Sequence, residues 1–195
     1  MGPISLRGGR ELDDPLATVL EFVAAYPGYD SQDADANSFD ERDLRLANRG
    51  GARISADEQG AILERREKIE GALRGIGRDA SLLDSQVPWV ALTQLFAGFG
   101  EIRGVGFSKM TKAVHRKRPG LIPILDSVVQ AYLAIEDPPD SFAEHATALV
   151  RSYRQDLDRN RAALRSIRRE LATRGHELTE VRILDILIWE TGGTQ

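Results

Sequence analysis

Cysteine is absent from this 195-residue chain, and its absence excludes more chemistry than any other feature of the composition. A chain without thiols forms no disulfide, no thiolate zinc site, no cysteine-ligated iron–sulfur cluster and no cysteine nucleophile. It fits a reducing compartment, and we expect a cytoplasmic protein. The three histidines stand at no spacing typical of metal ligands, so the sequence predicts no metal site; these residues are His115, His145 and His176. The sequence also predicts no cofactor.

Long apolar runs are also missing. No segment approaches the roughly 20 apolar residues that cross a bilayer, and residues 1–14 hold no apolar core of a signal peptide. We therefore expect no membrane partner. Hydrophobic residues make up 42% of the chain and charged residues 29%, which favours a globular protein over a disordered one. A domain of this length buries roughly 70% of its unfolded surface, which is enough for one core.

Lysine is scarce, and three of the four lysines lie between positions 109 and 117. The net charge of −4 argues against indiscriminate coating of nucleic acid. Residues 99–120 nevertheless combine six cationic side chains with Glu101 as the single acid, a balance of +5 that leaves −9 on the rest of the chain. Such a segment predicts a localised anion site, and its alternative is a solvated helix face. The six cations are Arg103, Lys109, Lys112, Arg116, Lys117 and Arg118.

Apolar residues recur at helical spacing along most of the chain, whereas strand alternation is nowhere sustained. The predicted fold class is therefore all-α, a multi-helical single domain over residues 1–195. A central helix-hairpin-helix core occupies about 85–135, and the N-terminal and C-terminal helices pack as a second layer. Residues 1–13 are expected to be irregular. We predict helices at 15–26, 41–49, 56–74, 89–96, 107–115, 126–132, 142–174 (one bent helix or two) and 181–189.

Several helix starts carry local signals. Asp14 precedes a proline at the first helical position, which is typical of an N-terminus. Ser55 with Glu58, and again Ser141 with Glu144, predict capping boxes in which two side chains satisfy the first free amides. These signals predict where three of the helices begin.

The most specific pattern lies in residues 102–129, which read IRGVGFSKMTKAVHRKRPGLIPILDSVV. Gly104 and Gly106 flank Val105 in a turn between two helices, where glycine permits positive φ and lets another molecule approach the backbone. The first amides of the helix that begins at Phe107 have no partner within the helix and are expected to face outward. Such a helix end favours phosphate binding.

Cationic side chains extend this predicted anion site. Lys109 and Lys112 share one face of the helix and would neutralise neighbouring phosphates. Arg42, Arg45 and Arg49 also share a helix face. They either add a second phosphate contact or form surface ion pairs with the acids close by.

This pattern resembles the hairpin of the helix-hairpin-helix DNA glycosylases, a superfamily of base-excision repair enzymes. Their hairpin has an apolar residue and a small residue or proline before Gly-apolar-Gly, and residues 102–106 match it except at Arg103. The superfamily also opens a later helix with an aspartate in an apolar-Asp-Thr or apolar-Asp-Ser context. Asp126 matches this context and follows Gly104 by 22 positions, a spacing typical of the superfamily. The resemblance covers residues 85–130.

The resemblance implies that DNA is the partner and that the target nucleotide is flipped out of the duplex. Asp126 would then be the catalytic carboxylate, stabilising positive charge on the deoxyribose as the base leaves. Bifunctional members carry a Schiff-base lysine where this chain has Ser108, so the resemblance implies a monofunctional N-glycosylase. Many members have histidine where this chain has Val128. The residues expected to grip the phosphate backbone are Arg103, Gly104, Val105, Gly106, Ser108, Lys109 and Lys112.

Each of these features has an alternative. Asp126 also suits a plain helix N-cap, and a Gly-Val-Gly turn can simply join two helices. The chain can equally be read as a non-catalytic helical interaction module of unknown function that reuses this core, with arginine-rich C-terminal helices docking a protein partner. Membership of an uncharacterised bacterial family would leave the activity open. In either case Tyr26 and Tyr29, beside a Pro-Gly turn, could line a cleft.

Overall fold

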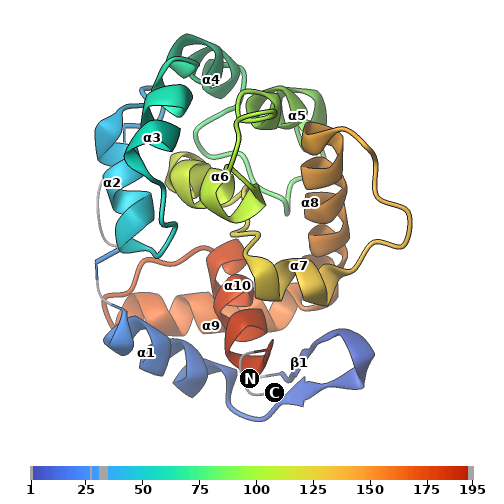
Figure 1. Ribbon diagram of the computed structural model, residues 1–195. Coiled ribbons are helices and arrows are strands. Elements are labelled where there is room, and N and C mark those ends of the chain that lie inside the picture. Colours follow the sequence, from blue (N-terminus) through green and yellow to red (C-terminus); the bar gives the residue numbers. More distant parts are fainter. Residues whose placement is uncertain (1, 27, 31–34, 193–195) are drawn as a thin grey trace.

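Helices form most of the structure, a computed structural model that describes all residues except 1, 27, 31–34 and 193–195 (Figure 1). Those residues of the predicted domain lie outside the described part. Within it the predicted all-α fold class is confirmed. Its elements are β1 (Ile4–Ser5), η1 (Arg7–Gly9), β2 (Glu11–Leu12), α1 (Pro15–Ala25), α2 (Glu41–Arg49), α3 (Ala56–Leu63), α4 (Arg66–Arg74), α5 (Trp89–Ala97), α6 (Phe107–Val114), η2 (His115–Lys117), α7 (Ser127–Leu133), α8 (Phe142–Arg159), α9 (Arg161–Thr173) and α10 (Glu180–Gly192).

The N-terminal segment contains a small antiparallel pair, β1 with β2, so the expectation that residues 1–13 are irregular is wrong. Distant residues hold this pair in place. The Ser5 amide donates to Asn160 Oδ1 at 2.8 Å, and Asn160 Nδ2 donates back to the Ser5 carbonyl at 2.9 Å. Arg7 Nε lies 2.6 Å from a carboxylate oxygen of the buried Asp156. The segment's own sequence contains none of these partners, which is why its order could not be foreseen.

All three predicted helix starts are confirmed, but only two of the three predicted side-chain caps form. Asp14 accepts a hydrogen bond from the Ala17 amide at 3.0 Å and caps α1. Ser55 and Glu58 form the complete capping box of α3. The box at Ser141 is wrong, because this side chain makes no cap hydrogen bond although α8 begins directly after it.

One long predicted helix is divided in the structure, and the stretch predicted as one bent helix or two is two helices. The predicted helix 56–74 is interrupted between α3 and α4, where Arg65 turns its guanidinium to the Gly100 carbonyl at 2.6 Å. The predicted stretch 142–174 is two helices, α8 and α9, and they meet at Asn160. Both junction side chains bind backbone from another part of the chain, and these contacts fix the turns.

Helix α10 is a central strut, as its apolar sequence predicts. Its side chains are buried from Glu180 to Ile188, and it packs against α1, α7, α8 and α9 (Figure 1). Further helix pairs, α5 with α8 and α2 with α6, complete a single hydrophobic cluster that extends from Ile4 to Ile188. Among the described residues, neither α10 nor any other helix combines the length and apolarity needed to cross a bilayer.

Candidate nucleic-acid interface

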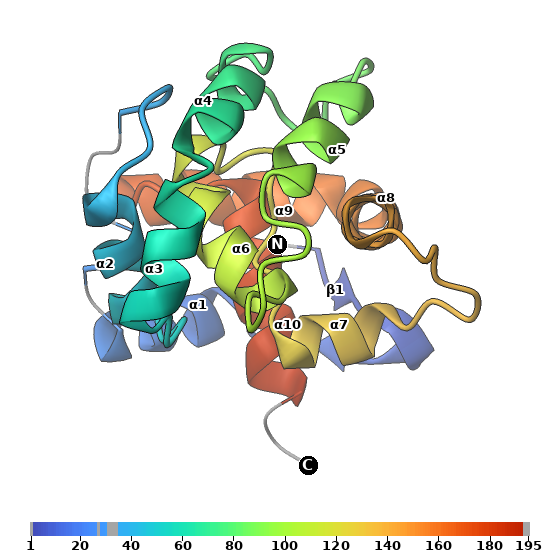
Figure 2. The ribbon, with the colours of Figure 1, turned by 45° about the horizontal axis from the view of Figure 1, so that its top comes forward.

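The hairpin between α5 and α6 uses its two glycines differently. It lies between α3 and α7 (Figure 2). Gly104 has φ +83°, a left-handed conformation that favours glycine. Gly106 has φ −93° and ψ −177°, extended backbone that other residues also adopt. Val105 turns its side chain into the core and is 6% exposed, so only its backbone is left to face a ligand.

The space around the two glycines also differs. A Cβ at Gly104 would collide with the carboxylate of Glu58, which reaches over from α3. A Cβ at Gly106 would meet no atom of the described residues within 4 Å. Glycine is therefore favoured at position 104 by its positive φ, with the Glu58 carboxylate having to shift if a Cβ were present. The bare backbone at Gly106 leaves room for another molecule.

This difference gives a stability prediction. We expect Gly104→Ala to lower the free energy of unfolding by about 1–3 kcal/mol, because it combines strained backbone with a collision. The matched control Gly106→Ala is expected to change it by less than about 0.5 kcal/mol. Urea denaturation of both variants measures the difference. Equal losses, or a larger loss in Gly106→Ala, would contradict the assigned hairpin geometry.

The N-terminal end of α6 opens onto a depression of about 610 Å³, which we call the hairpin groove. Among the described residues, no side chain caps this helix end, so its first amides are left without a side-chain partner in that part of the chain. Gly106, Ser108 and Lys112 line one side of the groove, and Asp126 at the start of α7 lines it as well. The groove thus brings three of the seven residues predicted to grip phosphate together with the predicted carboxylate. The other four do not line it; they are Arg103, Gly104, Val105 and Lys109.

Lys109 is not available to a ligand in the way the sequence suggested. Its Nζ lies 2.6 and 2.7 Å from the two carboxylate oxygens of Glu58. The two side chains are only 22% and 13% exposed. The hydrogen bond from Lys109 lowers the pKa of the Glu58 carboxyl, with a further contribution from the Ser55 amide. A phosphate at Lys109 would have to replace an ionised carboxylate.

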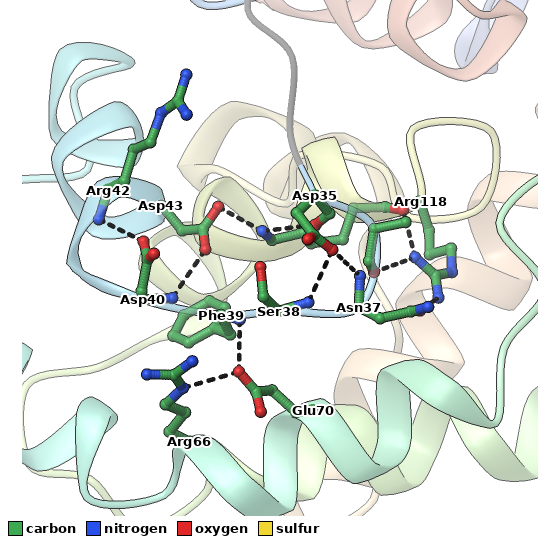
Figure 3. Close-up of polar contacts among 12 residues, drawn as sticks. Asp35, Asn37, Ser38, Phe39, Asp40, Arg42, Asp43, Arg66, Glu70 and Arg118 are labelled. Carbon is green, nitrogen blue, oxygen red and sulfur yellow. Dashed lines mark hydrogen bonds and ion pairs between the residues drawn. The ribbon is translucent and has the colours of Figure 1, made fainter.

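The predicted single basic patch is also wrong, because two of its cations are buried in structural contacts. Lys117 is 3% exposed, and its Nζ lies 2.6 Å from Asp43 at the start of α2. Arg118 is 1% exposed and binds the loop before α2 (Figure 3). It also binds the end of α4 and the turn that follows it. Its guanidinium donates to the Leu73 carbonyl at 2.6 Å, the Ala36 carbonyl at 2.6 Å, the Ile76 carbonyl at 2.8 Å and Asn37 Oδ1 at 3.0 Å.

The other cations near the cleft come from separate parts of the chain. Arg103 is exposed on the hairpin, and none of the described residues forms an ion pair with it. Arg116 instead lines a different depression of about 240 Å³. Two further arginines lie beside α6, and we call the hairpin groove and the cavity next to it together the cleft. Arg53 lines the hairpin groove, and Arg49, at the end of α2, lines the adjoining cavity. Arg49 belongs to the three arginines of α2 for which the sequence left open a second phosphate contact or surface ion pairs. Arg45, of the same three, forms an ion pair with Glu41.

Asp126 caps α7 and lines the cleft at the same time. Its Oδ1 accepts the Val129 amide at 3.0 Å, so the N-cap role that the sequence left open is realised. The same residue borders the hairpin groove and an adjoining cavity of about 510 Å³, and Lys112 borders both as well. Capping therefore leaves the carboxylate at the junction of the two depressions.

The backbone before Asp126 is held by two other helices. The Leu125 amide donates to Thr111 Oγ1 of α6 at 3.0 Å. The Ile124 amide donates to Asp185 Oδ2 of α10 at 3.0 Å. These bonds fix the carboxylate relative to the hairpin helix and to the strut, which is the rigidity that a catalytic group requires.

The cavity of about 510 Å³, which we call the aromatic cavity, has a wall of three rings. Phe22 and Tyr26 lie 4.9 Å apart between ring centroids, and Trp189 of α10 packs edge-on at 5.7 Å from Phe22 and 5.9 Å from Tyr26. Tyr29 also lines the cavity, so both tyrosines lie in a cleft, as the sequence suggested. Its volume falls within the range of small-molecule pockets.

Charged groups inside the aromatic cavity were missed by the sequence analysis. Asp185 lies on α10, and burial raises the pKa of its carboxyl to about 8. Arg182, one turn earlier, pairs with Asp30 at 2.9 and 3.1 Å. Burial lowers the pKa of Lys112, although nearby Asp126 opposes that shift. Among the described residues, no three acidic or histidine side chains come together as a metal ion would require.

These buried groups set the pH dependence of stability. The raised pKa of Asp185, about 8 against 3.8, makes the native state hold a proton that the unfolded chain loses, so stability falls as pH rises between these values. Burial lowers the pKa of His115 from 6.5 to about 4, so His115 removes stability as pH falls through that range. Below pH 6.5 the two groups change the free energy of unfolding in opposite directions. Above pH 6.5 only the titration of Asp185 changes it.

We therefore expect the free energy of unfolding to decrease from about pH 6.5 to about pH 8, by at most about 1.4 kcal/mol per pH unit. Asp185→Asn should abolish this decrease, because the amide does not titrate. Urea denaturation at both pH values tests it. A decrease of the same size in Asp185→Asn would assign the effect to another group.

The fold and the site define an all-α protein with a ligand-sized cavity lined by α1, α6, α7, α10 and the end of α2. The chain matches a family model over residues 20–192 and belongs to that family, which is described as a family of unknown function (DUF6308). The matched residues include every side chain that lines the hairpin groove and the aromatic cavity. No curated protein and no solved structure matched the chain in the same comparisons.

Proposed function

We propose that the cleft binds DNA by its phosphate backbone and receives a nucleotide turned out of the duplex, as the resemblance to helix-hairpin-helix DNA glycosylases implies. One observation carries the proposal. The uncapped end of α6, Lys112 and Asp126 line a groove that adjoins a cavity walled by aromatic rings. A phosphate would lie at the α6 end, and the extruded base would lie among the rings.

Asp126 is the proposed catalytic residue, and the reaction is hydrolysis of an N-glycosidic bond. The bond from the base to the deoxyribose breaks and its electron pair leaves with the base. The Asp126 carboxylate stabilises the positive charge that remains on the sugar. Water then adds its hydroxyl to the sugar, and its proton goes to the departed base. Because Ser108 stands where bifunctional enzymes have lysine, no Schiff base forms and the DNA strand stays intact.

Few phosphates are expected to contribute to binding. Lys112, Arg49 and Arg53 line the cleft, and the chain as a whole carries −4. The logarithm of the binding constant falls linearly with the logarithm of the salt concentration, and each neutralised phosphate makes this slope more negative by about 0.9. The proposal therefore includes weak binding to undamaged duplex and a preference for DNA whose nucleotide is already displaced.

The test is fluorescence anisotropy at low salt with a duplex that carries an abasic-site analogue. Wild type is expected to bind it more tightly than the undamaged duplex, and Lys112→Glu should lose about tenfold in affinity, equivalent to ~1.4 kcal/mol. Arg169→Glu on α9 makes the same kind of charge change away from the cleft and should bind as wild type. No binding by wild type, or equal losses in both variants, would refute the proposal.

Glu58 offers an independent prediction about the hairpin. Removing its charge in Glu58→Gln frees Lys109 from its ion pair and removes an anion from beside Gly104. Affinity for the abasic-analogue duplex should rise about three- to tenfold, and one more phosphate should enter the salt dependence. Glu67→Gln, an exposed acid on α4, is the control of equal charge change. Weaker binding by Glu58→Gln would mean that DNA does not reach the hairpin.

A non-catalytic interaction module is the second candidate, and α9 favours it. Arg165 and Arg169 are exposed there, and no described residue forms an ion pair with either of them. Arg168, between them, pairs with Glu180. Such a face suits an acidic protein surface. On this alternative, wild type would bind the abasic-analogue duplex no better than the undamaged one.

A further inference from the structure

A residue with strained backbone lies at the wall of the hairpin groove. Among the described residues other than glycine, only Arg53 and Glu101 have left-handed backbone, with φ +56° and +64°. Arg53 lines the groove, whereas Glu101 does not. Left-handed backbone is unfavourable for a residue with a Cβ, and it persists where the surrounding structure imposes it, often at functional sites. At Arg53 the fold therefore overrides the local backbone preference of a residue that faces the groove.

The turn that contains Arg53 is fixed by its neighbours. Asn48 Oδ1 accepts the Ile54 amide at 2.6 Å, and Asn48 Nδ2 donates to the Ile54 carbonyl at 2.9 Å. Ala52 and Ile54, on either side of Arg53, are buried, whereas Arg53 itself is exposed. These contacts impose the backbone conformation of the turn and leave the Arg53 side chain on the surface.

The same turn is held against α6, close to Lys112. The Tyr29 hydroxyl donates to the Lys112 carbonyl at 2.8 Å. Gly50 packs against the Tyr29 ring, since a Cβ at Gly50 would lie 2.8 Å from that ring. A Cβ at Gly51 would lie 3.8 Å from Lys112 Nζ, so the ammonium lies beside the turn. Lys112 and Arg53 both line the hairpin groove, and their backbones are fixed relative to each other.

Arg53 and Lys112 bring two positive charges together, and no described residue forms an ion pair with either of them. Asp126 is the one acid among the described residues that line the groove, and it caps α7. Burial lowers the pKa of Lys112, Asp126 raises it, and the charges of Arg182 and Arg53 lower it. The two cations therefore repel each other, and an anion between them would replace this repulsion with attraction.

We infer that Arg53 and Lys112 together hold one phosphate group in the hairpin groove, and that the strained turn presents Arg53 for this purpose. The inference deepens the proposed function and rests on it for the source of the phosphate, a phosphodiester next to the displaced nucleotide. A guanidinium fork and an ammonium can bind different oxygens of one phosphate. A phosphate fixed by both would set the register of the strand, and hence which nucleotide reaches the aromatic cavity.

A double-variant cycle tests whether both side chains bind the same phosphate. Arg53→Gly and Lys112→Gln should each weaken binding of the abasic-analogue duplex at low salt by about three- to tenfold. The double variant should bind about as weakly as the weaker single variant, because a phosphate released by one side chain is no longer held for the other. Losses that multiply would assign the two cations to separate phosphates and overturn the inference.

Glu101→Gly is the matched control, because it relieves the same kind of backbone strain outside the groove. Both glycine variants should be at least as stable in urea as wild type, since glycine adopts left-handed backbone freely. Only Arg53→Gly should lose affinity for the duplex, and Arg53→Lys should keep part of it through its charge. An equal loss in Glu101→Gly would mean that the backbone change, and not the guanidinium, weakens binding.

An NMR titration with inorganic phosphate keeps the inference apart from the proposed function. Wild type should show saturable shifts at residues 51–54 and at Lys112, and Arg53→Gly should bind phosphate at least about threefold more weakly. Duplex binding that is equal in wild type and Arg53→Gly would overturn the inference and leave the proposed function in place. Phosphate binding that depends on Arg53, without duplex binding, would do the opposite and assign the site to the phosphate of a smaller ligand. No binding of either probe by wild type would overturn both.

Discussion

The Asp126→Asn variant is expected to release a base about 10²- to 10³-fold more slowly than wild type, while binding an abasic-analogue duplex at least as tightly. Asparagine can still accept the Val129 amide, so the cap of α7 and the fold should persist. What the variant loses is the negative charge that opposes positive charge on the sugar. Single-turnover release from a panel of damaged-base duplexes measures the effect.

The control for this variant is Asp14→Asn. Asp14 caps α1 through the Ala17 amide at 3.0 Å, so the exchange has the same chemistry at a helix start outside the cleft. It should leave base release unchanged. If Asp126→Asn released base as fast as wild type, Asp126 would be a cap and nothing more. If wild type released no base from any duplex of the panel, the catalytic part of the proposal would fail and the binding part would remain to be tested.

The largest loss of stability is expected at Arg118. Arg118→Leu removes the donor to the buried carbonyls of Leu73 and Ile76 and to the partly buried carbonyl of Ala36. Leaving several acceptors without partners should lower the free energy of unfolding by about 3–5 kcal/mol. Urea denaturation at neutral pH provides the measurement.

Two control variants are compared with Arg118→Leu for their loss of stability. Arg118→Lys keeps the charge but offers fewer, differently arranged donors, so its loss should be intermediate. Arg169→Leu, at an exposed arginine, should change stability by less than about 0.5 kcal/mol. A loss at Arg118 no larger than that at Arg169 would mean that the buried guanidinium does not hold these segments together.

Local sequence signals predicted the helices well where the partners are also local. Asp14 caps α1, and Ser55 with Glu58 caps α3, because each bond joins residues three apart. The box at Ser141 shows that the right residues do not suffice. The division of 142–174 at Asn160 depends on a contact with Ser5 that lies 155 positions away in the sequence, and no window along the helix contains that information.

The charge analysis failed for a similar reason. Lys117 and Arg118 read as part of a basic surface because their partners, such as Asp43 and Ala36, precede them by more than 70 positions. Conversely, Arg53 joins the cleft only because the end of α2 lies beside α6. The net charge of a sequence segment therefore did not predict which cationic side chains lie together on the surface of the folded protein.

The candidate site was predicted in part. Of the residues predicted for the site, four line one groove: Gly106, Ser108, Lys112 and Asp126. Arg103, Gly104, Val105 and Lys109 do not line it. The aromatic cavity was not predicted, because its wall joins Phe22 of α1 to Trp189 of α10. One signal was present in the sequence: Asp185 interrupts the apolar run from Ile183 to Trp189. A lone acid in a buried helix is costly unless it is paired or neutral.

Hydrogen–deuterium exchange with and without the abasic-analogue duplex tests the central claim most directly. If a nucleic-acid strand meets the bare amides of the hairpin, exchange should slow over residues 104–110 and 126–130 and stay unchanged over α9. Unaltered exchange at the hairpin under conditions that saturate binding, or protection confined to α9, would contradict the claim that this cleft is where DNA is held.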